Sequence, residues 1–207
     1  FGGGSSPVLH KDTLVVLNDN EEASFIAGFD KKTGKELWRT GRTGLGTEQM
    51  RSAWSTPFVW ENAVRTEIVT TGPGVAISYD LQGRELWRLS LGARMAIQSP
   101  FSWEGLVYVT AGTAGDDRRP IAAIRPGASG DITPREGKTA GEYVAWLEPL
   151  AGGTYLPTPL VYDGGLYTLT DKGIFTRLDP MTGERTYKTR LHPDARNFTA
   201  SPWASRA

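Results

Sequence analysis

Six side chains with the chemistry to hold a ligand lie just ahead of four Ser-Pro or Thr-Pro steps in the sequence. They are Arg51, Trp54, Arg94, Gln98, Tyr155 and Asn197. Guanidinium groups and aromatic rings can together hold a planar anionic cofactor, a carboxylate or a peptide. The alternative is structural, because Arg and Gln side chains also cap strand ends and line water-filled channels. Which role applies depends on whether the fold brings these residues together.

The Ser-Pro and Thr-Pro steps mark an internal repeat. Their prolines are separated by 43 to 59 residues and are Pro7, Pro57, Pro100, Pro159 and Pro202. The first four steps each open a series of short β-branched and aromatic runs, a Gly-containing turn and a closing aromatic residue. Those closing residues are Trp38, Trp87, Trp146 and Tyr187. A period of about 40 to 50 residues with four strands per unit is typical of a propeller blade.

The first unit shows how each blade is built. Its strands are predicted at 7–9, 13–17, 25–30 and 35–39, each bounded by turn residues. In the last turn the carboxylate of Asp30 can cap backbone amides, and Gly34 supplies a position with positive φ. The third unit differs, because a polar, Gly-rich stretch at 125–141 replaces this tight turn, and we expect it to be a surface excursion.

The predicted fold is all-β: a β-propeller of four-stranded antiparallel blades, with about four blades and the first strand of a fifth. The units span about 4–40, 52–89, 96–147 and 154–190, and the next begins within 198–207. A strand near Pro202 is surplus to four complete units, so we expect it to begin a fifth blade, with further blades beyond it. The segments before the innermost strands should meet at the mouth of a central channel and bring the six candidate residues to one face.

The most specific turn sequences resemble the repeat of the pyrroloquinoline-quinone (PQQ) enzyme-like β-propellers. The matching stretches are Phe29–Arg39 and Asp179–Glu184. This resemblance implies that the chain is a segment of a ring of seven or eight blades. It further implies an exported bacterial protein, in the periplasm, the cell envelope or the medium. It also implies that the closing aromatic residue docks between adjacent blades, a role that falls here on Trp38, Trp87, Trp146 and Tyr187.

Composition limits the classes of function. The 23 basic and 23 acidic residues cancel, so no overall charge attracts nucleic acid or an anionic membrane. The chain has no Cys, which excludes disulfides and thiol chemistry, and no apolar run approaches the ~20 residues that span a bilayer. We therefore expect neither a nucleic-acid partner nor a transmembrane segment.

Dehydrogenases of the resembling family imply a test for catalysis. They bind PQQ with calcium on carboxylate and amide oxygens, use an Asp as base and often carry an adjacent Cys pair. Here the Cys pair is missing, and no segment at the channel mouth places an Asp beside an Asn or Glu. The oxygen-rich run 18–22 lacks the Gly and distal Glu of an EF-hand, so we interpret it as a solvated loop rather than a metal site. We expect no catalytic residue, no metal ligand and no cofactor, with PQQ and calcium as the alternative.

These observations favour a non-enzymatic binding or scaffold propeller that holds a protein or peptide on its loop face. A PQQ- and calcium-dependent quinoprotein dehydrogenase is the first alternative. A carbohydrate-binding propeller that uses Trp54 and Tyr155 is the second.

Overall fold

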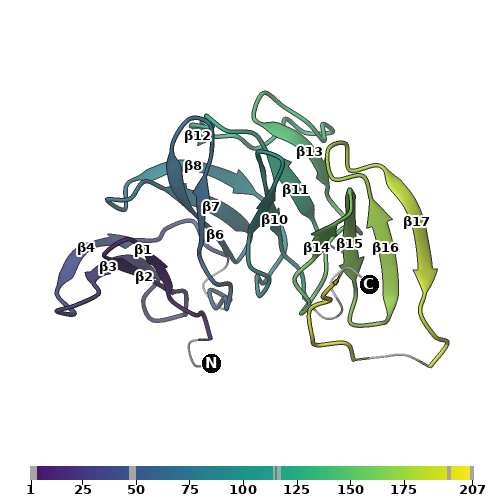
Figure 1. The fold of residues 1–207 in the computed structure, drawn as a ribbon, viewed down its shortest axis with the longest axis horizontal. Helices are drawn as coiled ribbons and strands as arrows, with labels where there is room; N and C mark the ends of the chain where they lie inside the picture. Colours follow the sequence, from purple (N-terminus) through teal and green to yellow (C-terminus); the bar gives the residue numbers. More distant parts are fainter. Residues whose placement is uncertain (1–3, 47–49, 114, 116–117, 195–196, 206–207) are drawn as a thin grey trace.

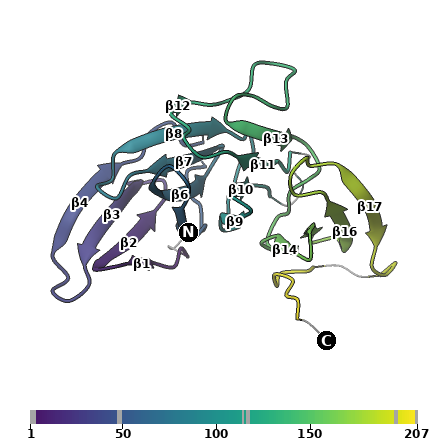
Figure 2. The same cartoon turned by 45° about the horizontal axis from the view of Figure 1, so that its top comes forward.

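The protein consists of β-sheets arranged side by side along an arc (Figures 1 and 2). The computed structural model describes residues 4–46, 50–113, 115, 118–194 and 197–205. Within these ranges the chain forms 17 strands in four sheets and contains no helix. The four sheets follow one another in chain order around a common axis, as consecutive blades do, so the predicted all-β propeller architecture is confirmed.

The first and last sheets are simple antiparallel meanders of four strands. The first comprises β1 (Val8–His10), β2 (Thr13–Asn18), β3 (Phe25–Asp30) and β4 (Glu36–Gly41). The last comprises β14 (Leu160–Tyr162), β15 (Gly165–Leu169), β16 (Ile174–Leu178) and β17 (Arg185–Arg190). In both sheets the innermost strand is the first in sequence and the outermost is the fourth.

The two middle sheets follow the same order, with one addition. The second sheet comprises β5 (Phe58–Glu61), β6 (Thr66–Gly72), β7 (Val75–Tyr79) and β8 (Glu85–Ser90). The third comprises β9 (Phe101–Trp103), β10 (Leu106–Thr110), β11 (Ile121–Ile124) and β13 (Val144–Glu148). A short strand, β12 (Gly130–Asp131), joins the second sheet although it lies within the third repeat unit.

The 125–141 stretch of the third unit is an ordered crossing between blades. Its strand β12 pairs in parallel with β8, with Gly130 opposite Trp87, and gives the second sheet a fifth strand. The amide of Ile132 donates to the carbonyl of Arg88 at 2.9 Å, and Ile132 is buried with the core of the second and third sheets. The sequence indicated a surface excursion, and the structure shows that its first half is anchored on the neighbouring blade.

The hydrophobic core lies between neighbouring sheets, because both faces of the middle sheets are covered. Strand β10 shows this clearly. Leu106 and Tyr108 pack in a cluster with the last sheet, whereas Val107 and Val109 pack in a cluster with the second sheet. Alternate side chains of a strand point to opposite faces, so the strands of a blade bury apolar residues at successive positions.

Three of the four closing aromatic residues, Trp38, Trp87 and Trp146, lie where described blades meet. The Trp38 ring lies so close to the turn of the second sheet that a Cβ added to Gly83 would lie 2.4 Å from it. A Cβ added to Gly183 of the last sheet would likewise lie 2.6 Å from the Trp146 ring. The Trp146 indole N–H also donates to the carbonyl of Pro180 at 2.8 Å. Trp87 is fully buried, whereas Tyr187 is 40% exposed on the last sheet.

Candidate functional site on the loop face

The described loops at one end of the sheets lie on one face of the molecule. Two kinds of connection lie there: those joining the second and third strands of each blade, and those leading from each outermost strand to the next innermost strand. The up-and-down order of every sheet puts both kinds at the same end. Four open hollows between these loops are lined by described residues. This face is the candidate functional site.

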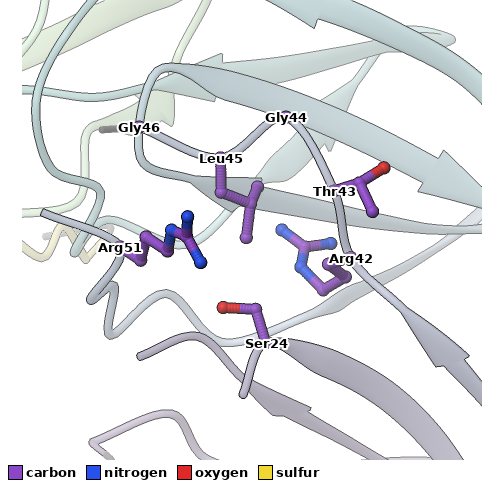
Figure 3. Close-up of a pocket in the computed structure, with 7 residues that line it drawn as sticks. All are labelled: Ser24, Arg42, Thr43, Gly44, Leu45, Gly46 and Arg51. Atoms are coloured by element: carbon purple, nitrogen blue, oxygen red, sulfur yellow. The ribbon is translucent and has the colours of Figure 1, made fainter. Parts of the chain in front are cut away.

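The hollow beside the first and second blades has a volume of about 480 Å³. It is lined by Ser24 after β2, by the segment 42–46 that leaves β4, and by Arg51. Figure 3 shows the guanidinium groups of Arg42 and Arg51 pointing into the same space from opposite sides, with the Ser24 hydroxyl below them. The Ser24 hydroxyl already donates to the carbonyl of Asn20 at 3.1 Å, so the guanidinium groups are the donors at this hollow that would suit a carboxylate or another anion.

Only one of these two guanidinium groups is available to a ligand. Arg42 is fully buried and forms a bidentate ion pair with Asp19, at 2.7 and 3.1 Å. It also donates to Thr70 and to the hydroxyl of Tyr79 on the second sheet, at 2.8 and 2.9 Å. Burial alone would lower the pKa of Arg42, but the Asp19 charge and the hydrogen bonds outweigh burial and raise it. Arg42 therefore links the first blade to the second, and Arg51 is the guanidinium group at this hollow that remains outside that ion pair.

The loop that follows β2 supports the segment that carries Arg51. The Ser52 hydroxyl lies 2.9 and 2.8 Å from the carboxylate oxygens of Glu21 and lowers the pKa of that carboxyl group. The side-chain oxygen of Asn20 accepts the amides of Glu22 and Ala23, at 2.9 and 2.7 Å. Three side chains of the 18–22 run thus have partners for their oxygens within the protein: Asn20 bonds within the loop, whereas Asp19 pairs with Arg42 and Glu21 with Ser52. Among the described residues, no three His, Cys, Asp or Glu side chains converge on a point where a metal would sit.

A second hollow adjoins the first and has a volume of about 280 Å³. Both are lined by Gly46. Arg94 lies at the rim of the second hollow and is exposed. The surrounding walls are largely backbone, because Gly46 and Leu91 donate their amides to the carbonyls of Pro73 and Gly74. The structure thus places Arg51 and Arg94 in adjoining hollows on one face.

The other candidate residues divide between interior and surface. Gln98 is completely buried, and its side-chain amide donates to the carbonyls of Thr154 and Tyr155 in the next loop. It acts here as a link between two loops. The ring of Trp54 lies against Gly4, and Tyr155 is half-buried. Asn197 adopts positive φ and lines a hollow beside the last blade. The neighbouring predicted positions at 47–49 and 195–196 lie outside the described residues.

The sequence reasoning missed the basic residues at the seam of the last two blades. Lys172 and Arg190 line the hollow that also contains Asn197, and Arg119 forms an ion pair with Asp171 at 2.6 Å across the seam. The connections between the second and third strands of each unit form half of the loop face. Lys172 and Arg119 lie in those connections. A search of the sequence for charged residues between the second and third strands of each unit would therefore have found them.

The comparisons with known proteins agree with this architecture. Residues 22–200 match the family model described as outer membrane protein assembly factor BamB. The chain belongs to this family. The resemblance to the PQQ-repeat propellers is thereby confirmed, since solved structures of both BamB and quinoprotein dehydrogenases share the fold. No curated protein matches the sequence.

Solved structures similar to this BamB-family chain share the fold at low identity. BamB from Moraxella catarrhalis has a TM-score of 0.57 at 12% identity, with 89% of this chain and 51% of that chain covered. Quinohemoprotein alcohol dehydrogenase ADHIIG from Pseudomonas putida HK5 has a TM-score of 0.60 at 16% identity, covering 90% and 34%. The corresponding enzyme from Comamonas testosteroni has a TM-score of 0.60 at 14% identity, covering 96% and 36%. The chain thus spans between about a third and a half of these proteins.

A cofactor site of the quinoprotein kind can be compared with the residues present. Arg51 and Arg94 are groups that suit the carboxylates of a planar anionic cofactor. A calcium ion takes six or more oxygen ligands, carboxylates among them. Among the described residues, no group of three or more His, Cys, Asp or Glu side chains gathers where a metal could bind. The described residues also contain no helix that could cross a membrane.

Proposed function

We propose that this chain is a non-enzymatic binding or scaffold propeller that holds a protein or peptide partner on its loop face. The observation that carries this proposal is the pair of adjoining hollows that present Arg51 and Arg94 along one face. They are shallow and lie in a row, which suits an extended chain with carboxylate or carbonyl groups better than one compact molecule. The family description as an assembly factor supports the same reading.

The words "outer membrane" in that description also support a place in the bacterial cell envelope, which we propose as the location. A protein in the periplasm or on the envelope meets many extended and unfolded segments of other proteins. A face of open, backbone-lined hollows with guanidinium groups would bind such segments through their carbonyl and carboxylate oxygens.

The experiment is a selection of peptides from a random displayed library on the immobilised protein, followed by affinity measurement. Selected peptides should bind at least ~10-fold more weakly to Arg51→Ala and Arg94→Ala, since a hydrogen bond to a charged group is worth about 1.5 to 3 kcal/mol. Lys35→Ala in the turn between β3 and β4 is the control and should bind as the parent does. If the selected peptides bound all three variants with the same affinity, the proposed role of this face would be disproved.

The quinoprotein alternative rests on the fold shared with the two alcohol dehydrogenases. It predicts that added PQQ and calcium give the protein the near-ultraviolet absorbance of the cofactor and dye-linked dehydrogenase activity. The scaffold proposal predicts neither. A carbohydrate partner at Trp54 and Tyr155 would instead show as quenching of tryptophan fluorescence by added sugars.

A further inference from the structure

The seam between the third and last blades carries four basic side chains, and among the described residues only one of them has an acidic partner. Two hollows flank the hairpin that joins β15 to β16, with volumes of about 200 and 420 Å³, and Lys172 at the tip of that hairpin lines both. Lys188 lines the first hollow and Arg190 the second. These three residues and Arg119 are called the seam cluster below.

Strand pairing fixes the direction of the seam cluster. In the last sheet, Thr176 pairs with Lys188 and Ile174 pairs with Arg190. Residues that face each other across two antiparallel strands project to the same side of the sheet. Thr176 is buried, and Leu178 on the same side of β16 packs in the core with the third blade. Lys188 and Arg190 therefore project from β17 toward the third blade and into the seam.

Two acidic side chains near the seam, Asp171 and Glu148, already have partners within the protein. Asp171 pairs with Arg119 at 2.6 Å, and both side chains are nearly buried. The Glu148 carboxylate accepts the amides of Leu150 and Ala151, at 3.1 and 3.3 Å. Arg190 donates to the carbonyl of Lys172 at 2.8 Å, which holds the guanidinium beside the hairpin without neutralising it. Within the part of the chain that the structure describes, the ammonium groups of Lys172 and Lys188 have no carboxylate or hydrogen-bond partner.

We propose that the seam cluster is a binding site for a phosphate group, held by Lys172 and Lys188 with Arg190 at its edge. The smaller hollow, at about 200 Å³, has room for such a group together with water, since one water occupies about 30 Å³ of liquid. Thr170 and Thr176 also line it and supply hydroxyl groups. The two ammonium groups and two hydroxyls of this hollow, with Arg190 in the adjoining one, suit the four oxygens and double charge of phosphate better than the two oxygens of a carboxylate.

This site is independent of the proposed peptide partner, because Arg51 and Arg94 lie in other hollows on the first two blades. Failure at the seam would leave the peptide proposal intact, and failure of peptide selection would leave the seam intact. The ligand has two possible sources, the free ion and a phosphate monoester on a larger molecule.

The test is a titration of the protein with inorganic phosphate and with O-phosphoserine at constant ionic strength, followed by the amide NMR signals of 170–173 and 188–190. Both probes should shift these signals, and acetate should not. Lys172→Gln and Lys188→Gln should each weaken binding ~10-fold, and the double variant should abolish the shifts. Tighter binding of phosphoserine would identify a phosphate carried on a larger molecule, and tighter binding of phosphate the free ion.

The matched control is the double variant Lys32→Gln/Lys35→Gln, which removes two exposed ammonium groups from a turn of the first blade. It changes the net charge by the same amount and should leave phosphate binding at the seam unchanged. Equal weakening in the control would show general charge attraction and overturn the proposal. Acetate shifts as large as those of phosphate would also overturn it, and so would unchanged affinity in the Lys172→Gln/Lys188→Gln variant with its fold retained.

Discussion

The backbone amide of Thr158 donates a hydrogen bond to the hydroxyl of Ser201 at 2.9 Å, although 43 residues separate them. The amide of Ser99 makes the same bond to the Thr158 hydroxyl at 3.3 Å, and the amide of Ser6 to the Thr56 hydroxyl at 3.2 Å. Each hydroxyl belongs to the residue before a proline, and proline keeps that residue extended. The repeated Ser-Pro and Thr-Pro steps therefore connect the entrance of one blade to that of the next.

Replacing Thr158 with Val should lower the free energy of unfolding by about 1 kcal/mol, because the amide of Ser99 loses its acceptor while the side-chain shape is kept. The measurement is equilibrium unfolding in urea. Thr158→Ser retains the hydroxyl and should lie closer to the parent. Equal losses in the two variants would show that the hydroxyl contributes nothing.

Gly83 and Gly34 allow the docking of Trp38 to be separated from backbone strain. Both adopt positive φ, at 81° and 70°, but only Gly83 has a neighbour, the Trp38 ring, where a Cβ would lie. Gly34→Ala should cost about 1 to 2 kcal/mol of stability from the backbone alone. Gly83→Ala should cost a further 1 to 3 kcal/mol, approximately the penalty of overpacking. Equal costs, compared by urea unfolding, would mean that Trp38 does not dock tightly there.

Trp87 should be the most sensitive of the closing aromatic residues. It is fully buried, and its indole N–H donates to the Glu67 carboxylate at 2.7 Å. Trp87→Ala should cost about 3 to 5 kcal/mol, as for a large buried aromatic residue. Tyr187→Ala is the comparison, since Tyr187 is 40% exposed and should cost ~1 kcal/mol or less. A loss under ~1 kcal/mol for Trp87→Ala in thermal or urea unfolding would contradict its place between blades.

The buried pair of Arg42 and Asp19 should respond asymmetrically to substitution. Arg42→Met leaves the Asp19 carboxylate buried without its partner and should cost about 3 to 5 kcal/mol. The double variant Arg42→Met/Asp19→Leu should recover much of that loss, because no buried charge remains. The check is a double-mutant cycle by urea unfolding, in which simple additivity of the two changes would exclude a direct coupling.

The turn carboxylates should make the protein less stable in acid. Desolvation is the largest single influence on the Asp80 carboxyl group and raises its pKa, but the amides of Arg84 and Gln82 and the Arg84 guanidinium together outweigh it and lower the pKa. Hydrogen bonds from Thr182 and Met181 amides lower the pKa of Asp179. A lowered pKa in the folded state gives stability that is present above the unfolded pKa, ~3.9, and is lost as pH falls through the folded value. Asp179→Asn should therefore melt below the parent at pH 7, and the difference should shrink toward pH 2 in thermal scans.

The fold followed from the sequence because each unit states its strand order locally. The spacing of prolines, the Asp-to-Gly turns and the closing aromatic residues all recur. An error in predicting one strand would therefore have changed the predicted structure of only one blade. The two parts of the role of Gly83 came from different sources: positive φ could be inferred from the turn, whereas docking by Trp38, 45 residues earlier, was expected only from the family resemblance.

The candidate site was harder to predict, since side-chain type does not reveal burial. Gln98 and Arg94 lie four residues apart, yet Gln98 is enclosed between loops and Arg94 is exposed. Arg42 and Asp171 were not singled out, because their partners come from loops distant in sequence. The sequence did not indicate that Lys172 belongs to a basic cluster. This follows only from the pairing of β16 with β17, which places Lys188 and Arg190 beside the hairpin tip.

Because the parallel strand β12 lies in the third repeat unit but pairs with the second sheet, the repeat units of the sequence do not coincide with the blades of the structure. The hydrogen bonds of β12 complete a sheet whose other strands were synthesised before it, so the second blade reaches its final form only after residues 130–132 have emerged. If this propeller were recombined at its repeat boundaries, the second blade would lose its outermost strand, β12. The third unit would then carry β12 into its new context without the strand it pairs with. Blade swaps that respect the sequence period should therefore fail at this junction, whereas an exchange that moves 58–148 as one piece keeps the shared rim intact.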